Sequence, residues 1–263
     1  METELSEMRP KPKPGIYILP SAMTTGNIFC GFYAVTASVA GDFNTAAVAI
    51  GIAIILDGVD GRIARLTGTT SKFGLQLDSL ADAISFGLAP AVVLWQWHLQ
   101  EFGYLGWIAC FMYMVCGVMR LARFNVQSPE LKHFLGMPIP AAAGVLAALT
   151  HFVEKYKDLT FFKSIGFSYA LIGLAVVLGA LMISTFRYPS FKNLSFGSGS
   201  SYRNILSLAL LIAGIWFLSH EVLFVLAAIY FFSGPWGTVR RYLSRKPAQP
   251  GLPEEKQVAN ENV

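Results

Sequence analysis

Residues 44–97 read NTAAVAIGIAIILDGVDGRIARLTGTTSKFGLQLDSLADAISFGLAPAVVLWQW, which is two apolar segments joined by a short polar stretch. Each segment is long enough to cross about 30 Å of hydrocarbon as a helix. Four aspartates, Asp57, Asp60, Asp78 and Asp82, interrupt this membrane-like sequence. A carboxylate in such surroundings costs several kcal/mol unless it is paired, protonated or bound to a metal. We therefore expect the four acids to share a function.

The spacing of the aspartates predicts that they meet. Asp57 and Asp60 are three residues apart and Asp78 and Asp82 are four apart, so each pair lies on one face of a helix. Residues 66–73 (LTGTTSKF) are typical of a turn, so the two helices run antiparallel and point all four carboxylates at one place. Mg²⁺ and Mn²⁺ prefer such oxygen ligands, and the absence of His and Cys from this window disfavours zinc. We predict a site for two Mg²⁺ or Mn²⁺ ions.

The composition indicates an integral membrane protein. The chain is 54% hydrophobic and 14% charged, whereas a globular domain is about 25% charged. We expect an all-α polytopic membrane bundle of about eight transmembrane helices. The apolar runs lie at 24–41, 44–66, 74–97, 104–126, 138–155, 166–186, 203–219 and 221–239.

The distribution of basic residues predicts the orientation in the membrane. With a cytoplasmic N-terminus, only Lys155, Lys157 and Lys163 of the 20 Lys and Arg residues fall on the outer side. Both termini and the aspartates are then expected at the cytoplasmic side. The chain shows no cleavable signal peptide and no nucleic-acid motif, and its net charge of +4 is explained by topology.

Small residues and one arginine accompany the acids. Gly61 and Ala64 lie beside the first pair, and Gly74 precedes the second pair, so a flat ligand has room to approach the backbone. Arg65 could add a positive charge toward phosphate groups. Asp82, the last of the four acids, is the candidate general base.

The pattern D-x2-D-G-x2-A-R-x8-G-x3-D-x3-D over residues 57–82 resembles the signature of the CDP-alcohol phosphotransferases. Members of that family transfer a substituted phosphate from a CDP-linked donor to an alcohol and release CMP. The resemblance implies that Asp57, Asp60 and Asp78 hold the metals that bind the pyrophosphate, with Asp82 near the metals as base. It also implies that Gly61 and Ala64 make space for the cytidine, and it suggests a homodimer.

Further stretches resemble the bacterial and archaeal membrane-integral members of this family that use L-serine as the acceptor. The resemblance implies CDP-diacylglycerol as the donor, phosphatidylserine and CMP as products, and the bacterial cytoplasmic (inner) membrane as the location. The matching stretches are 19–32, 78–91, 120–125, 136–144 and 184–192. We accordingly divide the chain into an N-terminal cytoplasmic or interfacial segment (1–23), a six-helix core (24–192), two additional helices (193–243) and a disordered cytoplasmic tail (244–263).

Three alternatives stay open at this point. Arg120, Arg123 and Asn125 either bind the acceptor or the donor phosphates, or merely mark the cytoplasmic end of a helix. The acceptor could instead be glycerol 3-phosphate, an inositol phosphate or an amino alcohol, which the alcohol that releases CMP would reveal. An ion-coupled transporter would use the aspartates as a cation site and would release no CMP.

Overall fold

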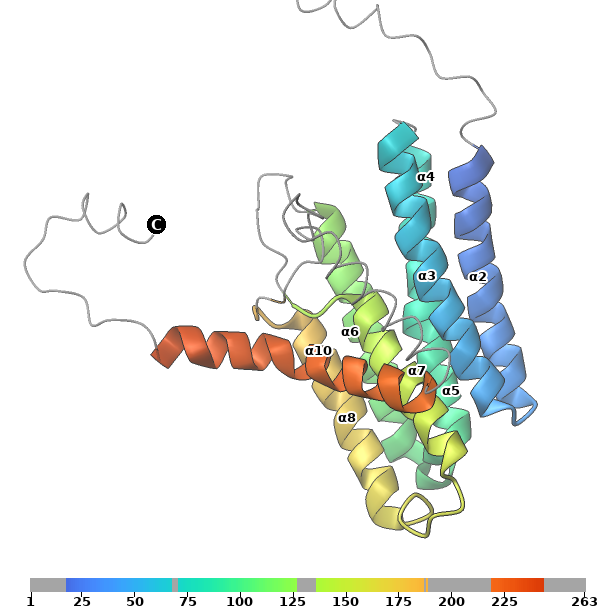
Figure 1. Cartoon of the computed structure of the whole chain (residues 1–263), viewed down its shortest axis with the longest axis vertical. Helices are drawn as coiled ribbons and strands as arrows, with labels where there is room; N and C mark the ends of the chain where they lie inside the picture. The colour runs from blue at the N-terminus through green and yellow to red at the C-terminus, as the bar shows by residue number, and fades with distance from the viewer. Residues whose placement is uncertain (1–17, 68–70, 127–135, 187, 189–218, 244–263) are drawn as a thin grey trace, which may run out of the picture.

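The computed structural model describes residues 18–67, 71–126, 136–186, 188 and 219–243. Every secondary-structure element in these ranges is a helix, which confirms the all-α part of the predicted fold class. The α-helices are α2 (Ile18–Val39), α3 (Phe43–Thr67), α4 (Lys72–Asp82), α5 (Ala89–Leu94), α6 (Gly103–Val126), α7 (Ile139–Lys155), α8 (Ile165–Ile183) and α10 (Ser219–Leu243). Figure 1 shows α2 to α8 running along the long axis of a bundle, with α10 lying across it.

The first two helices form an antiparallel pair. Gly41 has a φ of +81°, which suits glycine at the tight turn between them. The backbone N–H of Thr45 donates to Asp42 Oδ1 at 3.0 Å and so caps the start of α3. Hydrogen bonds from Thr45 hold the pKa of the Asp42 carboxyl below its ordinary value. The pair ends with the C-terminus of α3 beside the N-terminus of α2 (Figure 1).

The third predicted helix is continuous but irregular. Ser71 begins it, because its Oγ accepts a hydrogen bond of 2.9 Å from the backbone N–H of Gly74. After α4 the chain widens into the π turn η2 (Ala83–Leu88), continues as α5, and ends in the π turn η3 (Trp95–Leu99) and the 3-10 turn η4 (Gln100–Phe102). Such π turns are often found at functional sites, and η2 follows directly after Asp82.

Small side chains allow the central helices to pack closely. The buried face of α3 carries four alanines, and α7 contributes Ala142, Ala143 and Ala147 to the same core. Membrane helices associate through such residues because lipid offers no hydrophobic drive for their association. These contacts hold α3, and with it the first aspartate pair, at a fixed place in the bundle.

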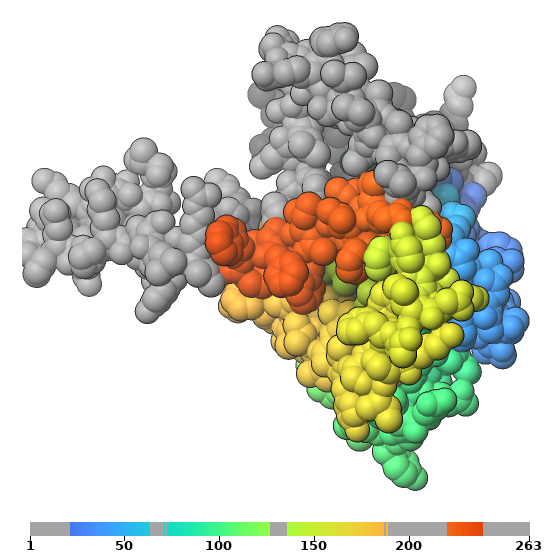
Figure 2. All heavy atoms as spheres, turned by 60° about the horizontal axis from the view of Figure 1, so that its bottom comes forward, coloured from blue at the N-terminus to red at the C-terminus, as the bar shows by residue number. Residues whose placement is uncertain are grey.

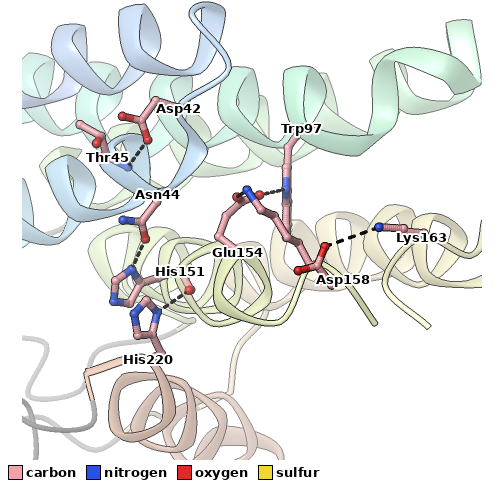
Figure 3. A network of polar contacts seen from close by, with 10 residues as sticks. Asp42, Asn44, Thr45, Trp97, His151, Glu154, Asp158, Lys163 and His220 are labelled. Atoms are coloured by element: carbon pink, nitrogen blue, oxygen red, sulfur yellow. Dashed lines mark hydrogen bonds and ion pairs between the residues drawn. The ribbon is translucent and has the colours of Figure 1, made fainter. Parts of the chain in front are cut away.

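The last helix packs chiefly against α7. Its first turn is held by Glu221, which bonds Lys155 and the Tyr156 hydroxyl at the end of α7. His220 Nδ1 contacts the carbonyl oxygen of His151 at 2.6 Å, and the His151 ring contacts Asn44 of α3 at 2.7 Å (Figure 3). Figure 2 shows α10 running alongside α7, with one end reaching α8.

Three described segments are long and apolar enough to cross a membrane: Phe73–Val126, Ile165–Ile183 and His220–Thr238. The expected span at 203–219 lies outside the described residues, so the count of eight helices stays a prediction. The first helix begins at Ile18, six residues before the expected span at 24–41. Pro20 is compatible with that start because a first helical turn needs no N–H donor.

Candidate active site

Three of the predicted acids meet where α3 and α4 face each other. One carboxylate oxygen from each of Asp57, Asp60 and Asp78 lies within 4.8 Å of the other two. Asp60 is buried, with 3% of its surface exposed, and the other two are half-buried. Two negative charges 4 Å apart repel by about 4 kcal/mol at an effective dielectric of 20. The cluster therefore needs bound cations or protons to be stable.

Asp82 completes the cluster one helical turn beyond Asp78. Its carboxyl lies against Asp57 and within electrostatic range of Asp78 and Asp60. Its Oδ1 atom is buried and has no hydrogen-bond partner among the described residues. The structure thus brings together all four aspartates that the sequence singles out, and Asp82 Oδ1 is available to a ligand.

A residue that the sequence analysis did not single out supports the cluster from α2. Thr24 is buried, and its Oγ1 donates a hydrogen bond of 3.1 Å to Asp60 Oδ2. Such a bond fixes the orientation of the Asp60 carboxylate in the cluster. The only sequence signal was a polar residue in the T-T-G-N stretch of an apolar helix.

Arg120 brings positive charge near Asp82. It lies on α6, 8% exposed, and interacts electrostatically with Asp82 and with Tyr230 of α10. Its Nε has no hydrogen-bond partner within the described part of the chain. A buried guanidinium near a half-buried carboxylate is suited to bind an anionic group close to the acids.

The family model described as CDP-alcohol phosphatidyltransferase matches residues 17–186, which is most of the chain and includes the whole acid cluster. The chain belongs to the CDP-alcohol phosphatidyltransferase family. This confirms the resemblance predicted from residues 57–82.

Several relatives in this family carry the name CDP-diacylglycerol–serine O-phosphatidyltransferase. The chain is 37% identical over 190 residues to the one from Helicobacter pylori strain J99, covering 69% of this chain and 76% of that protein. It is 39% identical over 164 residues to the one from Methanocaldococcus jannaschii (62% and 71% covered). It is 32% identical over 177 residues to the one from Bacillus subtilis (66% and 91% covered).

The other two predicted acceptor-binding residues, Arg123 and Asn125, form hydrogen bonds to neighbouring helices. Arg123 donates to the carbonyl oxygens of Ile183 at 2.9 Å and Met182 at 3.4 Å, and so caps the end of α8. Asn125 donates to Ser79 Oγ at 3.0 Å and ties α6 to α4. These contacts hold both residues against neighbouring helices, whereas Arg120 interacts electrostatically with Asp82.

The small residues have different surroundings. Gly61 is half-buried, next to Asp60 on α3. At Gly74, an added Cβ would lie 3.1 Å from Ser71 Oγ, so the absence of a side chain also serves the cap of α4. The side chains of Ala64 and Arg65 fall outside the described part of the chain.

The last helix lies beyond residue 186, where the CDP-alcohol phosphatidyltransferase match ends. The ring of Tyr188 stacks on Tyr230 with centroids 5.5 Å apart, and its hydroxyl donates to the carbonyl oxygen of Phe231 at 3.5 Å. At Gly234, a Cβ would lie 2.3 Å from the Tyr188 ring, so only glycine permits this contact without a shift. α10 thereby places Tyr230 near Arg120, a relation that the sequence does not predict.

Proposed function

We propose that this chain is a phosphatidylserine synthase, which transfers the phosphatidyl group of CDP-diacylglycerol to the hydroxyl of L-serine and releases CMP. The observation that carries the proposal is the convergence of Asp57, Asp60 and Asp78 beside the available Oδ1 of Asp82. The names of its relatives support CDP-diacylglycerol as the donor and serine as the acceptor.

The acid cluster suits divalent ions. Carboxylate oxygens within 4.8 Å of one another, with a further buried carboxylate oxygen at Asp82, are the ligands that Mg²⁺ and Mn²⁺ favour. Asp57, Asp60 and Asp78 would hold two such ions, with Asp82 at the edge of the site. When bound, the ions supply charge neutralisation for the pyrophosphate and for the departing CMP.

The residues around the cluster have distinct roles in the proposed reaction. Gly61 and Ala64 leave space for the cytidine on α3, Gly74 allows close approach at α4, and Arg65 adds charge toward the phosphates. Asp82 Oδ1 accepts the proton of the serine hydroxyl. The serine oxygen then forms a bond to the lipid-bearing phosphorus as that phosphorus loses its bond to the CMP oxygen.

In the proposed reaction, Arg120 neutralises the carboxylate of the bound serine. The serine carboxylate must approach a site that already contains four acids, where each close repulsion costs about 4 kcal/mol at an effective dielectric of 20. The buried guanidinium of Arg120 lies near Asp82 and offers a fork of donors to that carboxylate. Arg123 and Asn125 act by fixing α8 and α4 around it.

We also propose the orientation and assembly that the sequence suggests. The acid cluster lies at the cytoplasmic side of the bacterial inner membrane, and the two acyl chains of the donor stay in the bilayer. The ion pair between Lys155 and Glu221 supports this topology. The distribution of basic residues puts the end of α7 and the start of α10, which carry these two residues, on the same outer side. The family resemblance suggests a homodimer.

An acceptor panel tests the proposed function. Purified full-length protein is given labelled CDP-diacylglycerol with L-serine, glycerol 3-phosphate, inositol phosphate or ethanolamine, with Mg²⁺, Mn²⁺ or a chelator. We expect CMP release and a phosphatidylserine product with serine and a metal only. Release of CMP only with another alcohol would assign a different acceptor. Cation transport without any release of CMP would indicate a transporter.

A further inference from the structure

Asn27 of α2 is a fully buried amide that the proposed reaction leaves without a role. It has no exposed surface, and neither its Oδ1 nor its Nδ2 has a hydrogen-bond partner in the described ranges. Burying an amide in this way is costly, and in an apolar helix an alanine or leucine would avoid the cost. The position therefore calls for a ligand that uses the amide.

The neighbours of Asn27 place it at the acid cluster. It lies three residues after Thr24, on the same face of α2, and Thr24 donates to Asp60. Its backbone carbonyl accepts a hydrogen bond of 2.8 Å from Ser85 Oγ, and Ser85 follows Asp82 by three residues. Asn27 thus lies between the helix that carries Asp60 and the turn that follows Asp82.

The backbones approach closely at this point. A Cβ added at Gly31, one turn further along α2, would lie 2.5 Å from Ser85 Oγ and 2.8 Å from its Cα. This contact holds α2 against η2 and fixes the backbone of Asn27 relative to Asp82. A side chain held so firmly can recognise a small molecule without losing much conformational entropy.

The chemistry of an amide suits an amino-acid acceptor. Its Oδ1 can accept from an ammonium group and its Nδ2 can donate to a carboxylate, and it adds no net charge to a site with four acids. Asp82 and Arg120 interact electrostatically with each other, and the buried atoms Asp82 Oδ1 and Arg120 Nε also have no hydrogen-bond partner in the described part of the molecule. Together the three side chains complement a hydroxyl proton, a carboxylate and an ammonium group.

We propose that Asn27 binds the α-amino and α-carboxylate groups of the acceptor and so determines its specificity for an amino acid. This inference rests on the proposed function, because it concerns the acceptor of that reaction. It assigns α2 to acceptor selection as well as to support of Asp60.

The test compares Asn27→Leu and Asn27→Asp with wild type in the full-length protein. The matched control is Ser38→Ala. Ser38 is buried on the same helix, and its hydroxyl donates to the backbone carbonyl of Val35 one turn earlier. The measurements are the KM values for serine and CDP-diacylglycerol, equilibrium binding of CDP-diacylglycerol, thermal unfolding, and the rate ratio of ethanolamine to serine.

We expect Asn27→Leu to raise the serine KM by about 10- to 100-fold, as loss of a hydrogen bond to a charged group would. Donor binding and the unfolding temperature should stay close to those of Ser38→Ala. Asn27→Asp keeps the acceptor oxygen but repels a carboxylate, so it should shift the rate ratio toward ethanolamine, which has none. That shift keeps the proposal testable if the leucine variant does not fold.

Other results would overturn the inference. An unchanged serine KM together with an unchanged rate ratio would mean that Asn27 only packs in the core. Equal losses of donor and acceptor affinity would assign it to the donor or to a metal. Failure of the proposed function is distinguishable, because wild type itself would then release no CMP with serine. If wild type used another alcohol, a KM for that alcohol unaffected by Asn27→Leu would overturn the inference as well.

Discussion

Thr24 and Asp60 join α2 to α3 through a buried hydrogen bond of 3.1 Å at the edge of the acid cluster. The bond occupies one oxygen of a carboxylate that the proposed metals need in a fixed orientation. Outer partners of this kind typically change metal affinity or activity by about 10- to 100-fold when removed. Thr24 is therefore expected to matter although it touches no substrate in the proposed mechanism.

Thr24→Val should raise the Mg²⁺ or Mn²⁺ concentration needed for half-maximal CMP release by about 10-fold or more. The change keeps the branched shape and removes only the hydroxyl. Thr36→Val is the matched control, because Thr36 is exposed on the same helix and its hydroxyl donates to the backbone carbonyl of Tyr33. Equal metal dependence in the two variants would contradict the role of Thr24.

Asp57→Asn, Asp60→Asn and Asp78→Asn should each abolish turnover while the protein still inserts and folds. Each change removes one negative charge from the metal site and keeps the side-chain volume. CDP-diacylglycerol binding should weaken in parallel, since the donor pyrophosphate is held through the same site. The measurements are CMP release and donor binding at saturating metal, and normal activity in any one variant would exclude that residue as a ligand.

Asp82→Asn should separate chemistry from binding. Loss of a general base costs about 10²- to 10⁴-fold in rate. We expect that loss in CMP release, with CDP-diacylglycerol binding affected less than in the other three variants. Donor binding lost as completely as in Asp57→Asn would show that Asp82 acts chiefly as a metal ligand.

Arg120→Lys and Arg123→Lys should have different effects although both arginines end the same helix. At Arg120 a forked donor becomes a point charge beside Asp82, so the serine KM should rise more than the donor KM. At Arg123 the carbonyls of α8 lose their cap, so thermal stability should fall more than serine affinity. If neither variant alters the dependence on serine, another cation binds the serine carboxylate.

Gly234→Ala should loosen α10. A methyl group there would lie 2.3 Å from the Tyr188 ring, whereas at Gly173 of α8 it would meet no atom within 4 Å. Overpacking of this kind costs about 1–3 kcal/mol. We expect a lower unfolding temperature and a raised serine KM for Gly234→Ala, because Tyr230 lies near Arg120, and neither effect for Gly173→Ala. Equal behaviour of the two variants would show that the contact of α10 is not needed.

The sequence predicts the helical class and the meeting of the acids because both follow from local regularities. Apolar length identifies helices, and intervals of three and four residues put Asp57 with Asp60 and Asp78 with Asp82 on single faces. The turn is predicted at 66–73, whereas in the structure α3 ends at Thr67 and α4 begins at Lys72. With such a turn, only an antiparallel arrangement is needed to bring the two pairs together. Neither feature depends on side-chain contacts between residues that are far apart in the sequence.

The remaining features depend on tertiary contacts that spacing does not encode. Arg120 and Arg123 differ only in which helix each side chain faces, so the sequence leaves both as acceptor candidates. Thr24 and Asn27 are uncharged residues in an apolar helix and produce no hydropathy signal. The length of α10 follows from its apolar run, but its direction across the bundle follows from Tyr188, Gly234 and the contacts of Glu221.

The π turn after Asp82 has a consequence for tolerance to insertions and deletions. η2 is wound more widely than an α-helix, so it changes the rotation of the chain about the helix axis. The side chains before it, Asp78 and Asp82, and the buried side chains in and after it, Phe86 and Ala89, can therefore point in directions that a regular α-helix would not allow. Removing a single residue between Asp82 and Pro90 would swing everything beyond it by about 100°. The length of this segment is thus under constraint in addition to its buried side chains, so the loss or gain of one residue should be tolerated less well than a substitution at the exposed Leu88.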